Sequence, residues 1–233
     1  MENSAVTYVT RIENVREVIL HGAADLSFWR ARLHMSGLFP YQEQGRALLW
    51  LTATDLRWSG LRFQEFTLSL AVSQVEDGSR QDGFYLVGAF NSSRLLTLAE
   101  RTFFQTPYRR ARVQVDNQLP AMLALHAGAS TCLRASMTDV RPLLRSADEL
   151  WEGTIFLPQD AAATNSPGRC FRARLGGYTE TYPFLPDADT FELTPTPGHL
   201  VFQWLLQSDF RAQEWRLRAN ATHARSRTLA RWG

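Results

Sequence analysis

Lysine is missing from this chain: all 25 basic residues among its 233 are arginine. An imine between a protein side chain and a carbonyl substrate needs a lysine amine, so the sequence excludes Schiff-base catalysis on lysine. The 23 acidic residues leave a net charge of +2. That small excess gives no indication of binding to nucleic acid or to an anionic membrane.

Motifs for metals, phosphates and membranes are also missing. The two cysteines, Cys132 and Cys170, form no CxxC pair, and no two histidines are spaced as HxH or HxxxH. The chain has no Gly-rich phosphate loop and no GxSxG elbow. We therefore expect no metal and no cofactor. Neither a secretory signal nor a run of roughly 18 apolar residues is present, so we expect a cytoplasmic protein with free thiols.

Hydrophobic residues make up 45% of the sequence and aromatic residues 12%, enough for a sizeable core. Apolar side chains recur at every second position over much of the chain, which predicts strands bounded by turn residues. The predicted strands cover 46–58, 62–75, 83–90, 109–115, 121–127, 131–137, 153–158, 169–177 and 214–229. The predicted loops cover 76–83, 159–168, 185–189 and 194–198.

Three segments have the 3.6-residue period of helices instead. Ser93–Phe104 carries apolar side chains at spacings of three and four, with Ser92 or Ser93 as N-cap. Ala24–Leu33 and His199–Leu206 are shorter candidates. Nine or ten antiparallel strands with three helices predict an α+β protein, in which residues 1–233 form a single domain around a closed or nearly closed sheet. Such a sheet can enclose a small-molecule cavity.

The segment GFYLVGAFNSSRLLTLAERTFFQTPYRRARVQVD (83–116) reads as strand, turn, helix, turn and strand. It resembles the acetoacetate decarboxylase-like family, and most of all the branch of that family that lacks the Schiff-base lysine. ALLWLTATDLRWSGLRFQEF (47–66) and SDFRAQEWRLRANATHARSRTL (208–229) agree with the resemblance, which extends from about residue 16 to residue 230. It implies a cone-shaped, mostly antiparallel β-barrel with a few peripheral helices and a largely apolar cavity. Members of the family often form homo-oligomers.

The resemblance also implies site residues. Decarboxylating members carry adjacent lysines, one of which forms the imine, where this chain has Arg109 and Arg110. A guanidinium stays protonated and cannot attack a carbonyl, but it binds carboxylates well. Glu65 matches an acidic residue that lines the family's cavity, Trp50 stands near the family's second acidic position, and Arg16 lies near a family arginine.

Strand alternation assigns faces to these residues. Arg109 falls on the apolar face of its strand, where it would lie at the mouth of the cavity or at a solvated rim. Glu65 falls on a mixed face with Thr67 and Ser69, and we expect the opposite, apolar face to pack under helices. A buried Glu65 would need a partner such as Arg109 or a raised pKa suited to acid/base catalysis. The alternative is a solvated carboxylate.

His223 lies on a face of small and apolar residues in the last predicted strand, together with Arg225. It is either an acid/base group in the cavity or a hydrogen-bonded core residue. The same two interpretations hold for His126. Tyr108 comes directly before Arg109 and is expected near the same ligand.

The expected function is binding of a small molecule that carries a carboxylate or carbonyl group. The catalytic candidates are Glu65, Arg109 and His223, and the ligand-binding candidates are Arg16, Trp50, Tyr108 and Arg109. If the protein is an enzyme, it is an acid/base enzyme of the lyase, dehydratase or cyclase type that works without an imine. The alternatives are a non-catalytic binding or interaction protein that kept the fold, and a lipocalin-like carrier of an apolar ligand.

Overall fold

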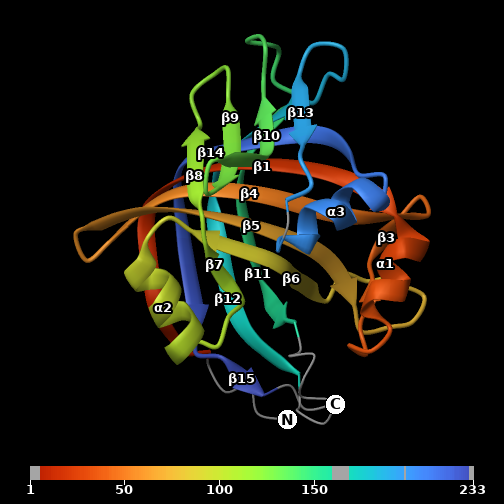
Figure 1. Ribbon diagram of the computed structural model, residues 1–233, viewed down its shortest axis with the longest axis vertical. Coiled ribbons are helices and arrows are strands. Elements are labelled where there is room, and N and C mark those ends of the chain that lie inside the picture. Colours follow the sequence, from red (N-terminus) through yellow and green to blue (C-terminus); the bar gives the residue numbers. More distant parts are fainter. Residues whose placement is uncertain (1–5, 159–167, 197, 231–233) are drawn as a thin grey trace.

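A computed structural model describes residues 6–158, 168–196 and 198–230 of the chain, and Figure 1 shows how its elements are arranged. The helices are α1 (Leu26–Leu33), α2 (Arg94–Phe103) and α3 (Leu200–Gln207). The strands are β1 (Tyr8–Asp25), β2 (Phe39–Pro40), β3 (Gln42–Glu43), β4 (Arg46–Trp58), β5 (Leu61–Ser73), β6 (Gly83–Asn91), β7 (Tyr108–Arg110), β8 (Arg112–Asp116), β9 (Met122–Ala127), β10 (Ser130–Ser136), β11 (Arg145–Leu157), β12 (Arg169–Pro183), β13 (Thr190–Leu193), β14 (Arg211–Ser226) and β15 (Leu229–Ala230). The predicted loop at 159–168 lies outside the described residues except for its last position.

The three predicted helices are present with nearly the predicted bounds. The hydroxyl of Ser93 accepts a hydrogen bond from the backbone N–H of Leu96 and caps α2, as the sequence predicts. Asp25 caps α1 in the same way through the N–H of Phe28. None of the helices that the structure describes is long and apolar enough to cross a membrane.

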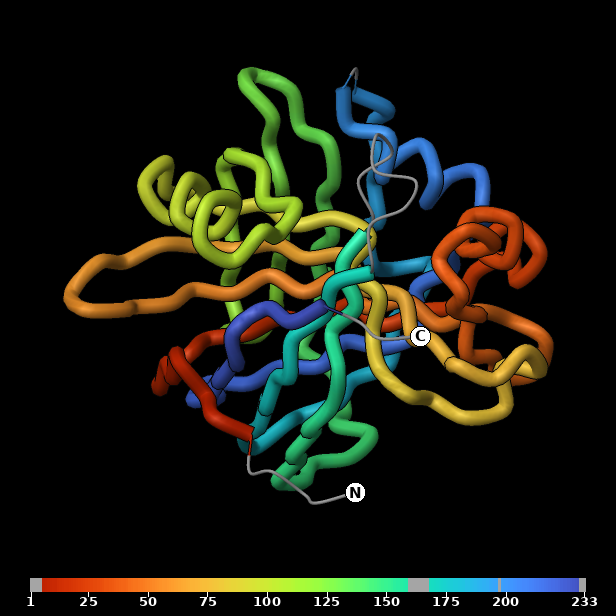
Figure 2. The backbone as a smooth tube through the Cα atoms, turned by 90° about the horizontal axis from the view of Figure 1, so that it is seen from below, coloured from red at the N-terminus to blue at the C-terminus, as the bar shows by residue number. Residues whose placement is uncertain are grey.

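The larger sheet is a closed ring of strands. Its hydrogen-bonded path runs β5-β4-β1-β14-β12-β11-β6, and the pairing of β6 with β5 joins its two ends. The hairpin of β4 and β5 projects beyond the other strands, next to α2 (Figures 1 and 2). Two pairings are parallel, because β6 runs parallel to both β11 and β7. The α+β class and the mostly antiparallel arrangement are confirmed.

Strand β1 was not predicted, although it pairs with both β4 and β14 along most of its length. Its pairing with β14 shifts register four times, including between Ile12 and Val15. Asn14, in that bulge, has a φ of 56°. Across this bulge the side chains of β1 that line the ring interior change from even positions, Thr10 and Ile12, to odd positions, Glu17 and Ile19, so the alternation of period two is broken within the strand. The sequence therefore hides a strand whose pairing is extensive.

The predicted strand 109–115 is in fact two strands in two sheets. β7 ends at Arg110 and belongs to the ring, whereas β8 begins at Arg112 and joins β9, β10 and β13 in a separate four-stranded sheet. The N–H of Ala111, between them, donates to the carbonyl of Asn91 at 3.1 Å. The chain thus leaves the ring at Ala111 and starts the second sheet.

The main core lies between the ring and the four-stranded sheet. The outward face of β5, which includes Phe66 and Leu68, is fully buried there with Leu123 of β9 and Phe202 of α3. The prediction that this face packs under helices is correct only for α3, because the small sheet covers most of it (Figure 1). The inward face of β5 is left for the interior of the ring.

Candidate functional site

The inner face of the ring encloses a cavity of about 1300 Å³ with mostly apolar walls. Its lining comes from alternate positions of the ring strands, such as Glu65, Thr67 and Ser69 of β5. Ionisable side chains are gathered on this wall in connected groups. The end next to α2 holds one group, and a chain of ion pairs leads from there to the opposite end, near β3.

Glu65 is held on the cavity wall by two hydrogen bonds. The side-chain amide of Asn91 donates to Oε1 at 2.8 Å, and the hydroxyl of Tyr108 donates to Oε2 at 3.1 Å. Burial and the negative charge of Glu100 raise the pKa of Glu65 to about 7. Burial and the neighbouring carboxylates also raise the pKa of Tyr108 well above its usual value, so that its phenol remains a donor. Glu65 can therefore gain or lose a proton near neutral pH.

Glu100, on α2, forms an ion pair beside this carboxyl. Its two oxygens accept from Nη1 of Arg225 at 2.9 and 2.7 Å, and one also accepts from the hydroxyl of Thr106 at 2.8 Å. The guanidinium of Arg225 lies 4.4 Å from the ring centre of Phe104 and 4.1 Å from that of Phe171. Cation–π contact of this kind stabilises a desolvated guanidinium. The pair fixes a negative charge close to Glu65 and leaves the group with little net charge.

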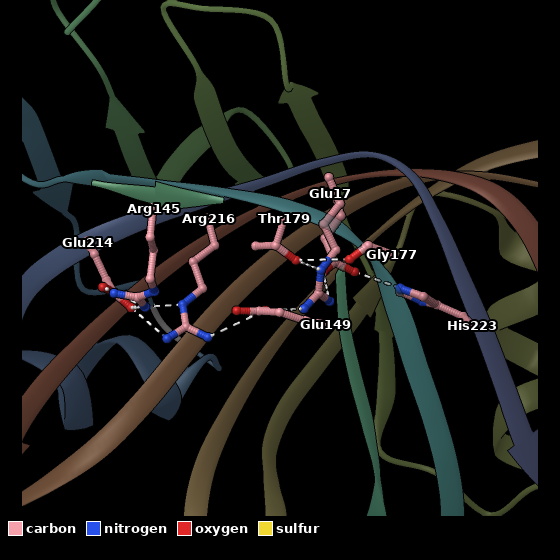
Figure 3. A network of polar contacts seen from close by, with 9 residues as sticks. Glu17, Arg145, Glu149, Gly177, Thr179, Glu214, Arg216 and His223 are labelled. Atoms are coloured by element: carbon pink, nitrogen blue, oxygen red, sulfur yellow. Dashed lines mark hydrogen bonds and ion pairs between the residues drawn. The ribbon is translucent and has the colours of Figure 1, made fainter. Parts of the chain in front are cut away.

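A chain of ion pairs begins at His223 (Figure 3). Nε2 of His223 lies 2.6 Å from Oε2 of Glu17, whose Oε1 accepts from Arg218 at 2.9 Å. Glu17 is only 1% exposed. Burial alone would raise the pKa of Glu17, but His223 and Arg218 hold it below its usual value. Glu17 is thus a buried carboxylate that orients the imidazole on the cavity wall.

The same chain continues to the other end of the cavity (Figure 3). Arg218 donates to Glu149 at 2.9 Å, and Glu149 lies 3.9 Å from Arg216. Arg216 and Arg145 both pair with Glu214, at 2.6 and 3.1 Å. Burial would raise the pKa of Glu214, but its neighbours, His21 and Arg216, lower it to about 2. Within the described residues, no three His, Cys, Asp or Glu side chains are grouped to hold a metal ion.

Substitution of Glu65 by glutamine is expected to stabilise the protein at pH 8 and to change its stability little at pH 4. In the folded protein the pKa of Glu65 is about 7, compared with an ordinary value of 4.5. The folded state keeps this proton while the unfolded chain loses it, so stability falls as the pH rises from 4.5 to 7, by at most about 3 kcal/mol. Glutamine does not titrate, so the variant keeps its stability as the pH rises. Urea unfolding of both proteins at the two pH values measures the difference.

The matched control is the substitution Glu76→Gln, since Glu76 is exposed in the loop before β6. Its effect on the free energy of unfolding is expected to be small and the same at both pH values. A difference between Glu65→Gln and the native chain that does not grow with pH would contradict the raised pKa.

Four of the predicted site residues line the cavity: Trp50, Glu65, Tyr108 and His223. Glu65 and Tyr108 contact each other directly, and His223 is near enough for its charge to affect the pKa of Glu65. Trp50 lies farther along the wall, beside His21. The roles predicted for these residues stay predictions.

Arg109 does not line the cavity, so of its two predicted positions the cavity mouth is wrong, and its exposed side chain agrees with the alternative of a solvated position. In the pairing of β7 with β6, Tyr108 lies next to Ala89, on the cavity side, and Arg109 lies next to Phe90, which faces the main core. The exposed guanidinium of Arg109 donates to the carbonyl of Gly198. Because the chain changes sheets at Ala111, the apolar face of β8 is not on the same side of the molecule as the face of β7 that carries Arg109.

Two further candidates lie outside the cavity. Arg16 is half-exposed and donates to Asp55 at 2.5 Å, and Asp55 also binds Arg62, so this cluster is on the outer side of the ring. His126 lies on the four-stranded sheet, where it contacts Gln114 at 3.1 Å and the hydroxyl of Thr131 at 3.0 Å. Neither residue belongs to the lining.

Sequence reasoning missed the ionisable residues that surround Glu65 and His223, among them Glu17, Glu100 and Arg225, and the ion pairs that continue from them. Arg225 was placed on the face of His223, and both indeed line the cavity, so alternation along β14 was the available signal. Glu100 falls on the helix face that follows Leu96, which packs on the ring, and the 3.6-residue period could have found it. Glu17 had no such signal, because its strand is bulged.

Comparisons of sequence identify no relative. No family model matches this chain, and no curated protein matches it.

Solved structures, in contrast, share its architecture. An acetoacetate decarboxylase from Legionella pneumophila is similar over 99% of this chain and 92% of its own, with a TM-score of 0.66 and 13% identity. An acetoacetate decarboxylase-like enzyme from Sphingomonas wittichii is similar over 94% and 92%, with a TM-score of 0.60 and 12% identity. The enduracididine biosynthesis enzyme MppR, in complex with the condensation product of pyruvate and imidazole 4-carboxaldehyde, covers 99% and 92% with a TM-score of 0.62 and 11% identity. The chain thus has the acetoacetate decarboxylase-like fold.

Proposed function

We propose that this protein binds a small carbonyl compound inside the ring and moves a proton at the carbon next to the carbonyl, with Glu65 as the acid/base group. The observation that carries the proposal is the carboxyl of Glu65 on the cavity wall, held by Asn91 and Tyr108. A general base must be oriented and must reach the substrate. The raised pKa of Glu65 suits this task, because the group can take up a proton and return it near pH 7.

The chain has no lysine, so the carbonyl compound reacts as the free ketone or aldehyde and not as a lysine imine. Loss of a proton from the neighbouring carbon gives an enolate, whose negative charge needs a hydrogen-bond donor. The hydroxyl of Tyr108 donates to Glu65 while that carboxylate is ionised. Once Glu65 has taken up the substrate proton, its own O–H can donate to the phenol oxygen, and the hydroxyl of Tyr108 is then free to donate to the enolate oxygen. An enolate formed in this way can eliminate a leaving group, attack a second carbonyl or be protonated again. These outcomes correspond to a lyase or dehydratase, a cyclase and an isomerase.

His223 is assigned a positioning role rather than a catalytic one. Its Nε2 is engaged by Glu17, and its charge state affects Glu65 through space. Arg109, Arg16 and Trp50 are not assigned to the proton transfer. The ligand carbonyl, in this proposal, meets Tyr108 instead of the guanidinium expected from the sequence.

Deuterium exchange tests the proposal. The native chain is incubated at pH 7 in D₂O with acetone, pyruvate, acetoacetate and 6-phenylhexan-2-one, and loss of the proton signal next to each carbonyl is followed by NMR. Exchange of at least one compound faster than in the protein-free solution is expected. If a compound binds, by calorimetry, and none exchanges faster than without protein, the proposal is wrong.

A second candidate function is non-catalytic binding of an apolar ligand. The mostly apolar wall and the large volume of the cavity favour it. It predicts binding without exchange, in the same assay. The carboxyl of Glu65 would then serve only to hydrogen-bond the ligand.

We also infer that residues 1–233 form one domain, because the main core includes side chains from both sheets, and that the ring is a cone-shaped barrel around its ligand.

Assembly into a homo-oligomer is supported by exposed apolar side chains on α2, where Leu95 and Leu98 are each 63% exposed and Phe103 is 79% exposed. The small net charge supports a small-molecule partner over nucleic acid. A cytoplasmic location stays a prediction.

A further inference from the structure

A row of four rings crosses the cavity wall at the end away from Glu65. His21 of β1 lies 4.4 Å from Trp50 of β4, Trp50 lies 4.8 Å from Phe84 of β6, and Phe84 lies 5.0 Å from Trp151 of β11, measured between ring centres. All four side chains line the cavity. We call this set the aromatic row. It comes from strands far apart in the sequence, and the contacts between its rings are continuous.

Small residues make this row possible. Strand β5 passes between Trp50 and Phe84, and the residues that it places opposite them are Ser69 and Ala71. Neither is large enough to separate the two rings. On β11, the ring of Trp151 lies over Gly153, where an added Cβ would come within 2.3 Å of the ring. The backbone therefore accommodates three large rings side by side on one wall.

The aromatic row is distant from the acid/base group. Glu65 and Ser69 lie on the same face of β5, four residues apart, which at about 3.3 Å per residue is a separation of roughly 13 Å. A four-carbon keto acid, with C–C bonds of about 1.5 Å, extends only about 5 Å. Such a compound at Glu65 leaves the aromatic row untouched. Between the two ends the wall carries neutral hydroxyl side chains, Thr52 and Thr67.

The charged groups beyond the row already have partners: Glu43 of β3 accepts from the hydroxyl of Tyr41 at 3.1 Å, and the others form ion pairs. Glu214 binds both Arg145 and Arg216, and its carboxylate also lies 3.4 Å from Nδ1 of His21. A charged ligand group there would have to displace one of these partners. The end of the cavity at the aromatic row therefore favours a neutral, apolar group.

We propose that the ligand is an elongated carbonyl compound whose far end is a neutral aromatic ring packed against the aromatic row. The position of the carbonyl end rests on the function proposed above, whereas the position of the ring does not. The cavity, which is partly open to solvent and has a volume of about 1300 Å³, accommodates a ligand of this length. Burying a phenyl ring and the alkyl chain that carries it is expected to raise the affinity at least 100-fold above that of the carbonyl group alone, and ring–ring contacts add to it.

Calorimetric titration with three methyl ketones tests the proposal: acetone, nonan-2-one and 6-phenylhexan-2-one. The phenyl ketone is expected to bind at least 100-fold more tightly than acetone and at least fivefold more tightly than nonan-2-one, which has a similar apolar surface but no ring. Equal affinity for the phenyl ketone and nonan-2-one would overturn the proposal that the far end of the ligand is an aromatic ring. Equal affinity for all three would overturn the elongated ligand as well.

Two variants locate the ring. Trp151→Leu and, separately, Phe84→Leu are each expected to weaken binding of the phenyl ketone at least fivefold and of nonan-2-one less than twofold. The matched control is Trp204→Leu, because Trp204 lies on α3, outside the cavity lining, and its substitution is expected to change neither affinity. Unchanged phenyl-ketone binding in both cavity variants, with circular dichroism like the native chain, would overturn the proposal.

The two proposals fail separately. Binding of the phenyl ketone is expected to survive Glu65→Gln within threefold, since the ring contacts remain. If the phenyl ketone binds more tightly than nonan-2-one but no ketone exchanges its proton, the proposed acid/base function is wrong and the aromatic-ring ligand is kept. If acetone and the phenyl ketone exchange equally fast and the phenyl ketone binds no more tightly than nonan-2-one, the acid/base function is kept and the aromatic-ring ligand is excluded.

Discussion

Glutamine at position 65 is expected to slow the proton exchange of a bound ketone by at least 100-fold. General acid/base groups commonly contribute factors of 10²–10⁴. The amide has nearly the shape of the carboxyl and can still accept from Tyr108, but it cannot take up a proton. The exchange rate of 6-phenylhexan-2-one in D₂O, measured by NMR at saturating ketone, reports the loss, and the affinity measured by calorimetry shows that the ketone is still bound.

Two comparisons make this result specific. The substitution Glu76→Gln, in an exposed loop, is expected to leave the exchange rate unchanged. In the native chain the rate is expected to rise with pH around 7 as Glu65 becomes ionised and able to act as a base, in line with its pKa of about 7. An exchange rate in Glu65→Gln within threefold of the native rate would show that another group is the base.

The free energy of unfolding is expected to fall by about 3–5 kcal/mol when Arg141 is replaced with methionine. Arg141 is 8% exposed and Asp189, its partner, is 7% exposed. The guanidinium donates to both carboxylate oxygens of Asp189, at 2.8 and 2.5 Å, and Trp215 of β14 donates to one of them at 3.0 Å. Without Arg141, the carboxylate is left buried without its cation. This bond network ties the loops around the small sheet to the ring.

The control for this prediction is Arg211→Met. Arg211 forms an ion pair with Asp209 at 2.9 Å, but its side chain is 73% exposed. Exposed pairs contribute about 0–1 kcal/mol, so urea unfolding of this variant is expected to be close to that of the native chain. If Arg141→Met were no less stable than Arg211→Met, the buried pair would not be a stabilising feature of the fold.

The parts of the fold with undisturbed periodicity could be predicted from the sequence. The amphipathic pattern after Ser93 gave α2 and its cap, because an α-helix of this length keeps one period throughout. The alternation along β5 correctly separated an apolar face from the mixed face that carries Glu65. β1 could not be predicted in this way, since its bulges reverse the faces within the strand.

The candidate site could be predicted only in part, because the contacts that build it join strands whose patterns say nothing about one another. The resemblance to the family indicated Glu65. The neighbours of Glu65, among them Glu100, which raises its pKa, became known only from the structure, because Asn91 and Glu100 approach it from β6 and α2. Alternation was continued across Ala111, where the chain changes sheets, so the apolar face assigned to Arg109 could not decide between the cavity mouth and a solvated rim. A change of sheet within seven residues leaves no mark in the pattern of apolar residues. The aromatic row was equally hidden, because contacts between four strands have no signature in any one of them.

The closure of the ring through β5 and β6 has a consequence for how proteins of this shape diversify. A residue inserted into one strand would exchange the lumenal and outward side chains beyond it and disturb the register with its neighbours, unless a bulge absorbed it as in β1. We therefore expect a change of ligand to need only new side chains at the lumenal positions, and changes of chain length to be tolerated best in the connections beyond the strand ends.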